Sequence, residues 1–164
     1  LQPYEIFVVT NQVIREKIQA IAWGQTQITE SSYLLVFAAW DNYTAERINQ
    51  AFDMTEKLRN FKSEAGDIYR QKLLSTYPTR DAELNFTHAA KQAYIGLGTA
   101  LIAAAYEDVD CTPMEGFDAV RVKKALQLPA GAEINMIIAV GKGTEAGVWG
   151  PRFRVPYNEV VVER

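Results

Sequence analysis

Two arginines near the C-terminus have the types and spacing of an anion-binding pair. Arg152 and Arg154 are separated by a single residue within residues 150–156. Alternate side chains of an extended segment point the same way, so both guanidinium groups would lie on one side of it. Each guanidinium is a forked donor that matches the oxygens of a phosphate. We therefore predict that this pair can hold a phosphate group.

Residues 112–118 form a second segment with potential chemistry. Pro113, Gly116 and Asp118 follow a short strand-like stretch. Asp118 is a good N-cap for a helix, and Gly116 permits backbone conformations that other residues avoid. Backbone N–H groups in such a connection can face a bound ligand. The plainer alternative is a strand-to-helix connection that ends in a good cap.

The other reactive residue types suggest no catalytic template. His88 is the only histidine and lies in a helical stretch, so a surface or packing role is preferred to a general base. Cys111 is the only cysteine, which excludes an internal disulfide and a multi-cysteine metal site. With no base or basic cluster beside it in the sequence, Cys111 is interpreted as a buried, unreactive thiol. A single cysteine also fits a reducing cytosol.

Two glycine-containing stretches do not match nucleotide-binding motifs. Residues 141–144 read Gly-Lys-Gly-Thr after a strand, but the spacing of a phosphate-binding loop is absent, so we expect a surface turn. Gly96 and Gly98 lie inside a helical pattern instead of between a strand and a helix, which indicates close helix packing.

Strands and helices alternate along the chain without an internal repeat. This order predicts one α+β domain over residues 1–164. The apolar stretch 95–105 predicts a helix that is central or lies at a subunit interface. The expected strands are residues 4–10, 33–40, 109–112, 134–140 and 158–162, and the expected helices are residues 12–22, 44–75 as one or two helices, 81–106 and 118–126.

Composition limits the classes of partner. The 164 residues are 48% hydrophobic and 23% charged, which suits a globular domain with a substantial core. The net charge is −3 and Lys and Arg form no block, so we expect neither nucleic acid nor an anionic membrane as partner. Without a signal-peptide pattern or an apolar stretch long enough to span a bilayer, a soluble cytoplasmic protein is expected.

At residues 113–118 the sequence resembles the nitroreductase family, whose members often carry Pro-x-Glu-Gly-Phe-Asp before a short helix. The likeness extends to residues 1–4 before the first strand, to residues 91–94 in the central helix, and to the Arg-x-Arg-x-Pro tail at residues 152–156. These segments occur in the family's order and span nearly the whole chain. The resemblance implies a mostly antiparallel central sheet flanked by helices, with the C-terminal strand exchanged in a homodimer.

The same resemblance implies that FMN binds in a cleft at the dimer interface. It assigns one catalytic contact, in which the backbone N–H of Glu115 faces flavin N5. The residues that it places around FMN are Gln2, Gln27, Gln92, Ile95, Pro113, Met114, Glu115, Gly116, Arg152 and Arg154.

The sequence departs from the family pattern in two places. Gly24 stands where relatives frequently have an asparagine against the flavin edge. The chain also begins at Leu1, almost directly before a strand, without the Arg-rich start and Ser-containing loop that are usual in the family. We expect a segment to precede it, and weaker flavin binding if none does.

The implied reaction is ping-pong: NAD(P)H passes a hydride to FMN, and a nitroaromatic, a quinone or a similar small acceptor takes the electrons. Two alternatives stay open. One is another flavin reaction, such as dehalogenation or substrate oxidation, decided by the segments around residues 44–78. The other is a family member that keeps the fold but has lost catalysis.

Overall fold

A computed structural model describes residues 1–144, 150–151 and 153–164. Up to the C-terminal tail, its strands and helices follow the order expected from the sequence, except for a short helix at Gln27–Glu30 that the sequence did not predict. The strands are β1 (Tyr4–Val9), β2 (Tyr33–Trp40), β3 (Asp110–Met114) and β4 (Ala132–Gly141). The helices are α1 (Gln12–Ile21), α2 (Gln27–Glu30), α3 (Ala45–Arg59), α4 (Glu64–Thr76), α5 (Ala82–Tyr106), α6 (Ala119–Ala125) and α7 (Tyr157–Val160).

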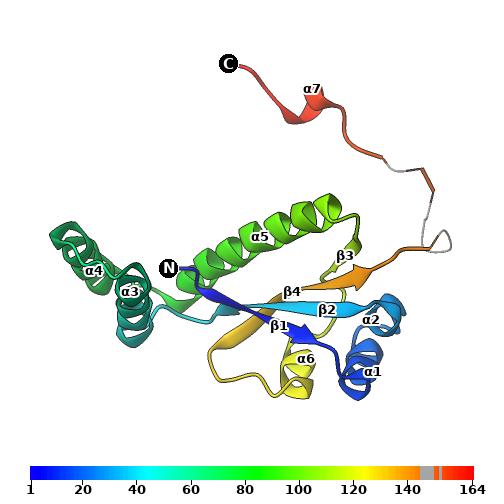
Figure 1. Ribbon diagram of the computed structural model, residues 1–164, viewed down its shortest axis with the longest axis horizontal. Coiled ribbons are helices and arrows are strands. Elements are labelled where there is room, and N and C mark those ends of the chain that lie inside the picture. The colour runs from blue at the N-terminus through cyan, green and yellow to red at the C-terminus, as the bar shows by residue number, and fades with distance from the viewer. Residues whose placement is uncertain (145–149, 152) are drawn as a thin grey trace.

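The strands form one antiparallel sheet in the order β1-β2-β4-β3 (Figure 1). This confirms the mostly antiparallel sheet flanked by helices. β2 lies inside the sheet, and its side chains from Leu34 to Ala39 are buried or half-buried. Both faces are therefore covered, as its continuous apolar sequence predicts.

A β-bulge in β4 gives one polar side chain a special position. Phe37 pairs with Met136 and Ala38 pairs with Ile134, so Asn135 is the extra residue. Its Oδ1 accepts a hydrogen bond from the Ala39 N–H at 3.1 Å, replacing a backbone acceptor. Bulges re-aim side chains in this way and are common beside functional sites.

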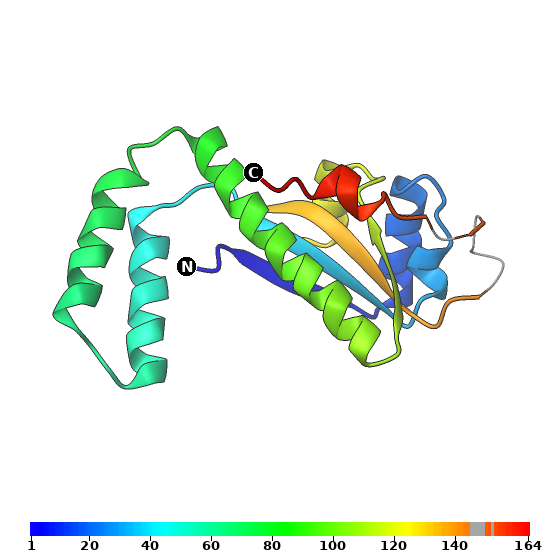
Figure 2. The same ribbon diagram turned by 90° about the horizontal axis from the view of Figure 1, so that it is seen from above.

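Helices cover the two faces of the sheet differently. α5 crosses one face, while α1, α2 and α6 pack on the other (Figures 1 and 2). Under α5 the core contains Phe37, Leu97 and Ile138. Gly96 allows this approach, because a Cβ there would lie 2.6 Å from the Tyr4 hydroxyl oxygen. The expectation of close packing is thus confirmed at Gly96, whereas a Cβ at Gly98 would meet nothing within 4 Å.

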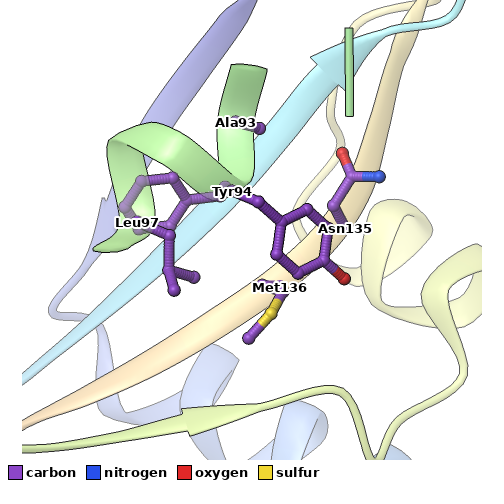
Figure 3. A pocket seen from close by; sticks show the side chains of 6 residues that line it. Ala93, Tyr94, Leu97, Asn135 and Met136 are labelled. Carbon is purple, nitrogen blue, oxygen red and sulfur yellow. The ribbon is translucent and has the colours of Figure 1, made fainter. Parts of the chain in front are cut away.

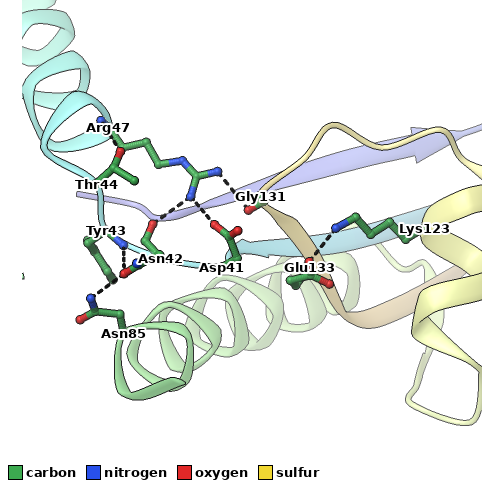
Figure 4. Close-up of polar contacts among 9 residues, drawn as sticks. All are labelled: Asp41, Asn42, Tyr43, Thr44, Arg47, Asn85, Lys123, Gly131 and Glu133. Carbon is green, nitrogen blue, oxygen red and sulfur yellow. Dashed lines mark hydrogen bonds and ion pairs between the residues drawn. The ribbon is translucent and has the colours of Figure 1, made fainter. Parts of the chain in front are cut away.

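α3 and α4 form a helical hairpin that projects from one end of the sheet (Figure 2). Asn60, with a left-handed φ of 47°, ends α3 and separates the two helices. Polar contacts fix the base of the hairpin (Figure 4). Arg47 donates to Asp41 Oδ1 at 2.6 Å and to the Gly131 carbonyl at 3.1 Å. Asn85 Nδ2 donates to Asn42 Oδ1 at 2.7 Å, which ties the start of α5 to the segment before α3.

α5 is the longest described helix, and Asp81 caps its start by accepting from the Glu83 and Leu84 N–H groups. Its outer face carries exposed apolar residues such as Ile95 and Ile102. No helix in the described ranges is both long and apolar enough to cross a membrane.

The prediction of a strand at residues 158–162 is wrong. Residues 157–160 form the single helical turn α7, in which the Val161 N–H donates to the Tyr157 carbonyl at 2.8 Å. The Val-rich sequence favours a strand, but a strand needs a neighbour for its backbone hydrogen bonds. The tail stands clear of the sheet in Figure 1, so a helical turn satisfies part of its backbone locally.

Candidate functional site

The connection between β3 and α6 forms a tight turn around Glu115 and Gly116. The Phe117 N–H donates to the Glu115 carbonyl at 2.8 Å. Asp118 then caps α6, its side chain accepting from the Arg121 N–H at 3.0 Å. Within the described part of the chain, the N–H groups of Glu115 and Gly116 have no hydrogen-bond acceptor. Two neighbouring backbone donors are therefore available to a ligand.

The loop between α1 and α2 lies against this turn. Gln25 Nε2 donates to the Gly116 carbonyl at 2.8 Å and to the Ala22 carbonyl at 3.1 Å. Gln27 Nε2 in turn donates to Gln25 Oε1 at 3.2 Å. Gly116 has no room for a side chain, since a Cβ would lie 2.8 Å from the ring of Trp23. The loop therefore brings two amide side chains and an aromatic ring to the turn.

Arg15 fixes α2, the short helix that follows that loop. Its side chain is buried in α1 and donates to the Ile28 carbonyl at 2.7 Å and to Ser31 Oγ at 2.7 Å. Burial lowers the pKa of this guanidinium from its ordinary value. A buried cation is stabilised when its donors are satisfied in this way.

Tyr94 contacts the turn from the opposite side. Its hydroxyl, carried by α5, donates to Glu115 Oε1. Burial, the hydrogen bond to Glu115 and the charge of that carboxylate together raise the pKa of Tyr94 to about 12. Tyr94 therefore remains a protonated donor at neutral pH.

The Tyr94 ring lines a crevice between α5 and β4 together with Asn135 and Met136 (Figure 3). The crevice has no interior space large enough for a water molecule. Ligand pockets usually hold roughly 300 to 1,000 Å³. A ligand as large as a flavin would therefore lie over the open surface beside the turn, not inside this crevice.

The structure brings together most of the residues predicted to surround FMN. Pro113 and Met114 end β3, Glu115 and Gly116 form the turn that follows, and Gln27 reaches the turn through Gln25. Met114 is only 5% exposed and packs in the core, so only its backbone could face a ligand.

Two further predicted residues lie on α5 and flank Tyr94. Gln92 is half-buried, and the side chain of Ile95 is 64% exposed. Because Tyr94 contacts Glu115, this part of α5 lies beside the turn.

Two predicted residues, Gln2 and Arg154, are not brought to the turn, and a third lies outside the described residues. Gln2 is exposed on the segment that leads into β1. Arg154 is exposed on the tail, where its Nη1 donates to the Phe153 carbonyl at 2.7 Å. Arg152 lies outside the described residues. That both arginine side chains lie on the same side of the tail therefore stays a prediction from the sequence.

Gln25 and Tyr94 are the contacts that the sequence did not identify. Gln25 stands two residues before Gln27, which was assigned to the flavin edge, and Tyr94 ends the stretch of residues 91–94 that resembles the family. Either position could have suggested a polar contact, but neither indicated its partner.

His88 and Cys111 occupy the plain roles that the sequence favoured. His88 Nδ1 lies 2.8 Å from the Tyr43 hydroxyl, in a packed cluster with Tyr77. Burial, with the charges of Arg80 and Lys91, lowers the pKa of His88. Cys111 is half-buried, and burial together with Asp110 raises the pKa of its thiol, which disfavours the reactive thiolate.

Comparison with known proteins identifies relatives of this chain by sequence. A Thermus thermophilus protein named NADH dehydrogenase is 27% identical over 164 residues, which cover 100% of this chain and 77% of that protein. The Bacillus subtilis protein YfkO, provisionally named an NAD(P)H nitroreductase, is 32% identical over 157 residues, covering 86% of this chain and 69% of that protein.

Solved structures agree with this assignment. The structure of Bacillus subtilis YdfN, provisionally named a nitroreductase, matches with a TM-score of 0.85 at 25% identity, over 99% of this chain and 78% of that one. An Exiguobacterium sibiricum protein, also provisionally named a nitroreductase and solved in complex with FMN, has the same fold, with a TM-score of 0.80 at 17% identity over 99% of this chain and 77% of that one. The Nitroreductase family profile matches residues 1–142. The chain therefore belongs to the nitroreductase family.

Proposed function

We propose that the protein is an FMN-dependent oxidoreductase that uses NAD(P)H to reduce nitroaromatics, quinones or similar small acceptors. The observation that carries this proposal is the turn after β3, which is held in place by Gln25 and presents the N–H groups of Glu115 and Gly116 without an acceptor among the described residues. The name of YfkO, an NAD(P)H nitroreductase, and the FMN complex of the Exiguobacterium protein support it.

The chemistry of these donors fits a flavin. FMN, when bound, accepts a hydride from NAD(P)H and passes the electrons to an acceptor. Under this proposal the Glu115 N–H donates to flavin N5, and the amide of Gln27 lies against the polar edge of the ring. Fixed backbone dipoles beside a reacting atom stabilise developing charge without reorganising, which is an efficient contribution to catalysis. The protein itself supplies no nucleophile.

Arg152 and Arg154 complete the proposed site by binding the FMN phosphate, for which forked guanidiniums are well suited. In the single chain Arg154 is exposed on the tail, a segment that extends away from the sheet (Figure 1). For these arginines to reach the flavin, the tail must either contact the Glu115 turn of a second chain or move toward the turn of its own chain.

We propose a homodimer for this reason. The tail exposes large apolar side chains: Phe153 and Tyr157 are each 73% exposed. On α5, Ile95 and Ile102 are 64% and 61% exposed. Apolar surface of this extent commonly marks an interface. Light scattering of the purified protein should give twice the mass of one chain, and a monomer would contradict the dimer.

The flavin reaction can be tested with the purified protein and added FMN. After unbound FMN is removed, the visible spectrum is recorded, and NADH or NADPH is added without oxygen. We expect retained flavin absorbance that bleaches with at least one of the two nucleotides. A protein that retains no FMN would contradict the cofactor assignment. Retained FMN that neither nucleotide bleaches would contradict the assigned electron donor.

A further inference from the structure

We infer that Tyr94 is a positioning residue for the Glu115 backbone: it holds the Glu115 carboxylate toward α5, so that the N–H groups of the turn stay free for the flavin. This inference rests on the proposed function, because it assigns a role within the same site. The hydroxyl of Tyr94 donates to Glu115 Oε1, joining α5 to a turn 21 residues away in sequence.

The turn is held from two sides by distant parts of the chain. Gln25 binds the Gly116 carbonyl from the α1–α2 loop at 2.8 Å, and Tyr94 binds the Glu115 side chain from α5. The backbone between these two anchors cannot rotate freely without breaking one of them. Donors that are fixed before a ligand arrives bind it with a smaller loss of conformational entropy.

The Tyr94 contact also decides where a negative charge lies. A carboxylate is a strong acceptor for backbone N–H groups, and the Glu115 side chain is exposed and otherwise free to turn. Among the described residues, neither the Glu115 nor the Gly116 N–H bonds to that carboxylate. Engaging the carboxylate at Tyr94 therefore removes a competitor for the donors.

The ring of Tyr94 is placed by packing that does not depend on its hydroxyl. It lines the crevice with Asn135 and Met136, and Asn135 is itself fixed by its hydrogen bond to Ala39 (Figure 3). Tyr94→Phe therefore keeps the ring and removes only the donor. The same helix offers a matched control in Tyr106, which is 88% exposed.

Amide hydrogen exchange of the full chain without FMN tests the positioning role directly. The readout is the exchange rate of the Phe117 amide, whose N–H donates to the Glu115 carbonyl. We expect Tyr94→Phe and Glu115→Leu each to accelerate exchange by about three- to tenfold, a modest factor because the bond is partly exposed to solvent. The double variant should exchange no faster than either single variant. Glu115→Gln should stay closer to the unchanged protein, because its amide oxygen still accepts from Tyr94.

A second readout uses the protein loaded with FMN. Tyr94→Phe should slow flavin reduction by NAD(P)H several-fold at saturating nucleotide and alter the visible spectrum of the bound flavin, while the KM for the nucleotide changes little. Tyr106→Phe should leave exchange, rate and spectrum unchanged.

The inference is overturned if the amide of Tyr94→Phe exchanges at the same rate as that of the unchanged protein. It is also overturned if the double variant exchanges faster by the product of the two single-variant factors, because the two side chains would then act independently. Because exchange is measured without FMN, this result is independent of whether FMN binds. Failure of the unchanged protein to retain FMN would instead contradict the proposed function.

Discussion

Gln25 donates to the carbonyl of Gly116 across a separation of 91 residues, at a distance of 2.8 Å. This hydrogen bond joins the loop after α1 to the turn that follows β3. The same amide also bonds to Ala22, and Gln27 bonds to it in turn. The contact therefore makes a continuous polar edge from two segments that are far apart in the chain.

Replacing Gln25 by leucine should weaken FMN binding by about tenfold, because two hydrogen bonds that position the turn are lost. The dissociation constant can be measured from the quenching of FMN fluorescence. Gln50→Leu, an exposed position on α3, is the matched control. Equal affinities for the two variants would show that the Gln25 contact does not shape the site.

Alanine at the two glycines of α5 should change stability in opposite directions. At Gly96 a Cβ would lie 2.6 Å from the Tyr4 hydroxyl oxygen, so the Tyr4 side chain or the backbone that carries it must shift, at a cost of about 1 to 3 kcal/mol. At Gly98 a Cβ meets nothing within 4 Å, and the change should stabilise the helix by about 0.5 to 1 kcal/mol. Urea unfolding at equal protein concentration measures both. A stabilising Gly96→Ala would contradict the packing of Tyr4 on α5.

Arg15→Met should destabilise the protein by about 2 to 4 kcal/mol, because the Ile28 carbonyl and the Ser31 hydroxyl lose a buried charged donor. The variant should also bind FMN more weakly, since α2, which follows the Gln25 loop, is no longer fixed. Lys17→Met on the exposed face of the same helix provides the control. Chemical unfolding gives the free energy for each. If both variants lose the same amount, Arg15 does not anchor α2.

His88 should make stability depend on pH. Burial, with Arg80 and Lys91, lowers its pKa in the folded protein below the ordinary value of 6.5. The unfolded chain therefore takes up a proton at higher pH than the folded chain. Stability is fully present above the unfolded pKa and is lost as pH falls from about 6.5 through the lowered folded pKa.

His88→Gln should lose this dependence while retaining a partner for the Tyr43 hydroxyl. Urea unfolding of both proteins at about pH 7.5 and about pH 5.5 makes the comparison, because the histidine of the unfolded chain titrates between these values and most carboxylates do not. The difference between the two pH values should be smaller in the variant. An equal difference in both proteins would rule out His88 as its source.

The sequence predicts those parts of the site whose signals are adjacent in the chain. Pro113, Gly116 and Asp118 lie within six residues, so the turn and its helix cap can be recognised locally. Strand and helix positions follow from apolar periodicity in the same way. The spacing of the two arginines in the tail can also be recognised, although the sequence does not show where the tail lies relative to the Glu115 turn.

The missed features depend on pairing between distant segments. Nothing in the sequence near Gln25 points to Gly116, and nothing near Asn135 shows that it is the extra residue of a bulge. The predicted strand at residues 158–162 fails for the related reason that β-propensity does not supply a neighbouring strand. Register and long-range polar contacts are therefore visible only once the chain is folded.

The most direct test of the proposed site is the response of the Glu115 and Gly116 amides to FMN. Two-dimensional nitrogen–proton NMR of labelled protein follows both amides, which sequential triple-resonance experiments assign. FMN should shift the amide resonances of Glu115 and Gly116 with the same concentration dependence as the change in flavin absorbance. Bound FMN that leaves both resonances in place would contradict the assignment of the flavin to this turn.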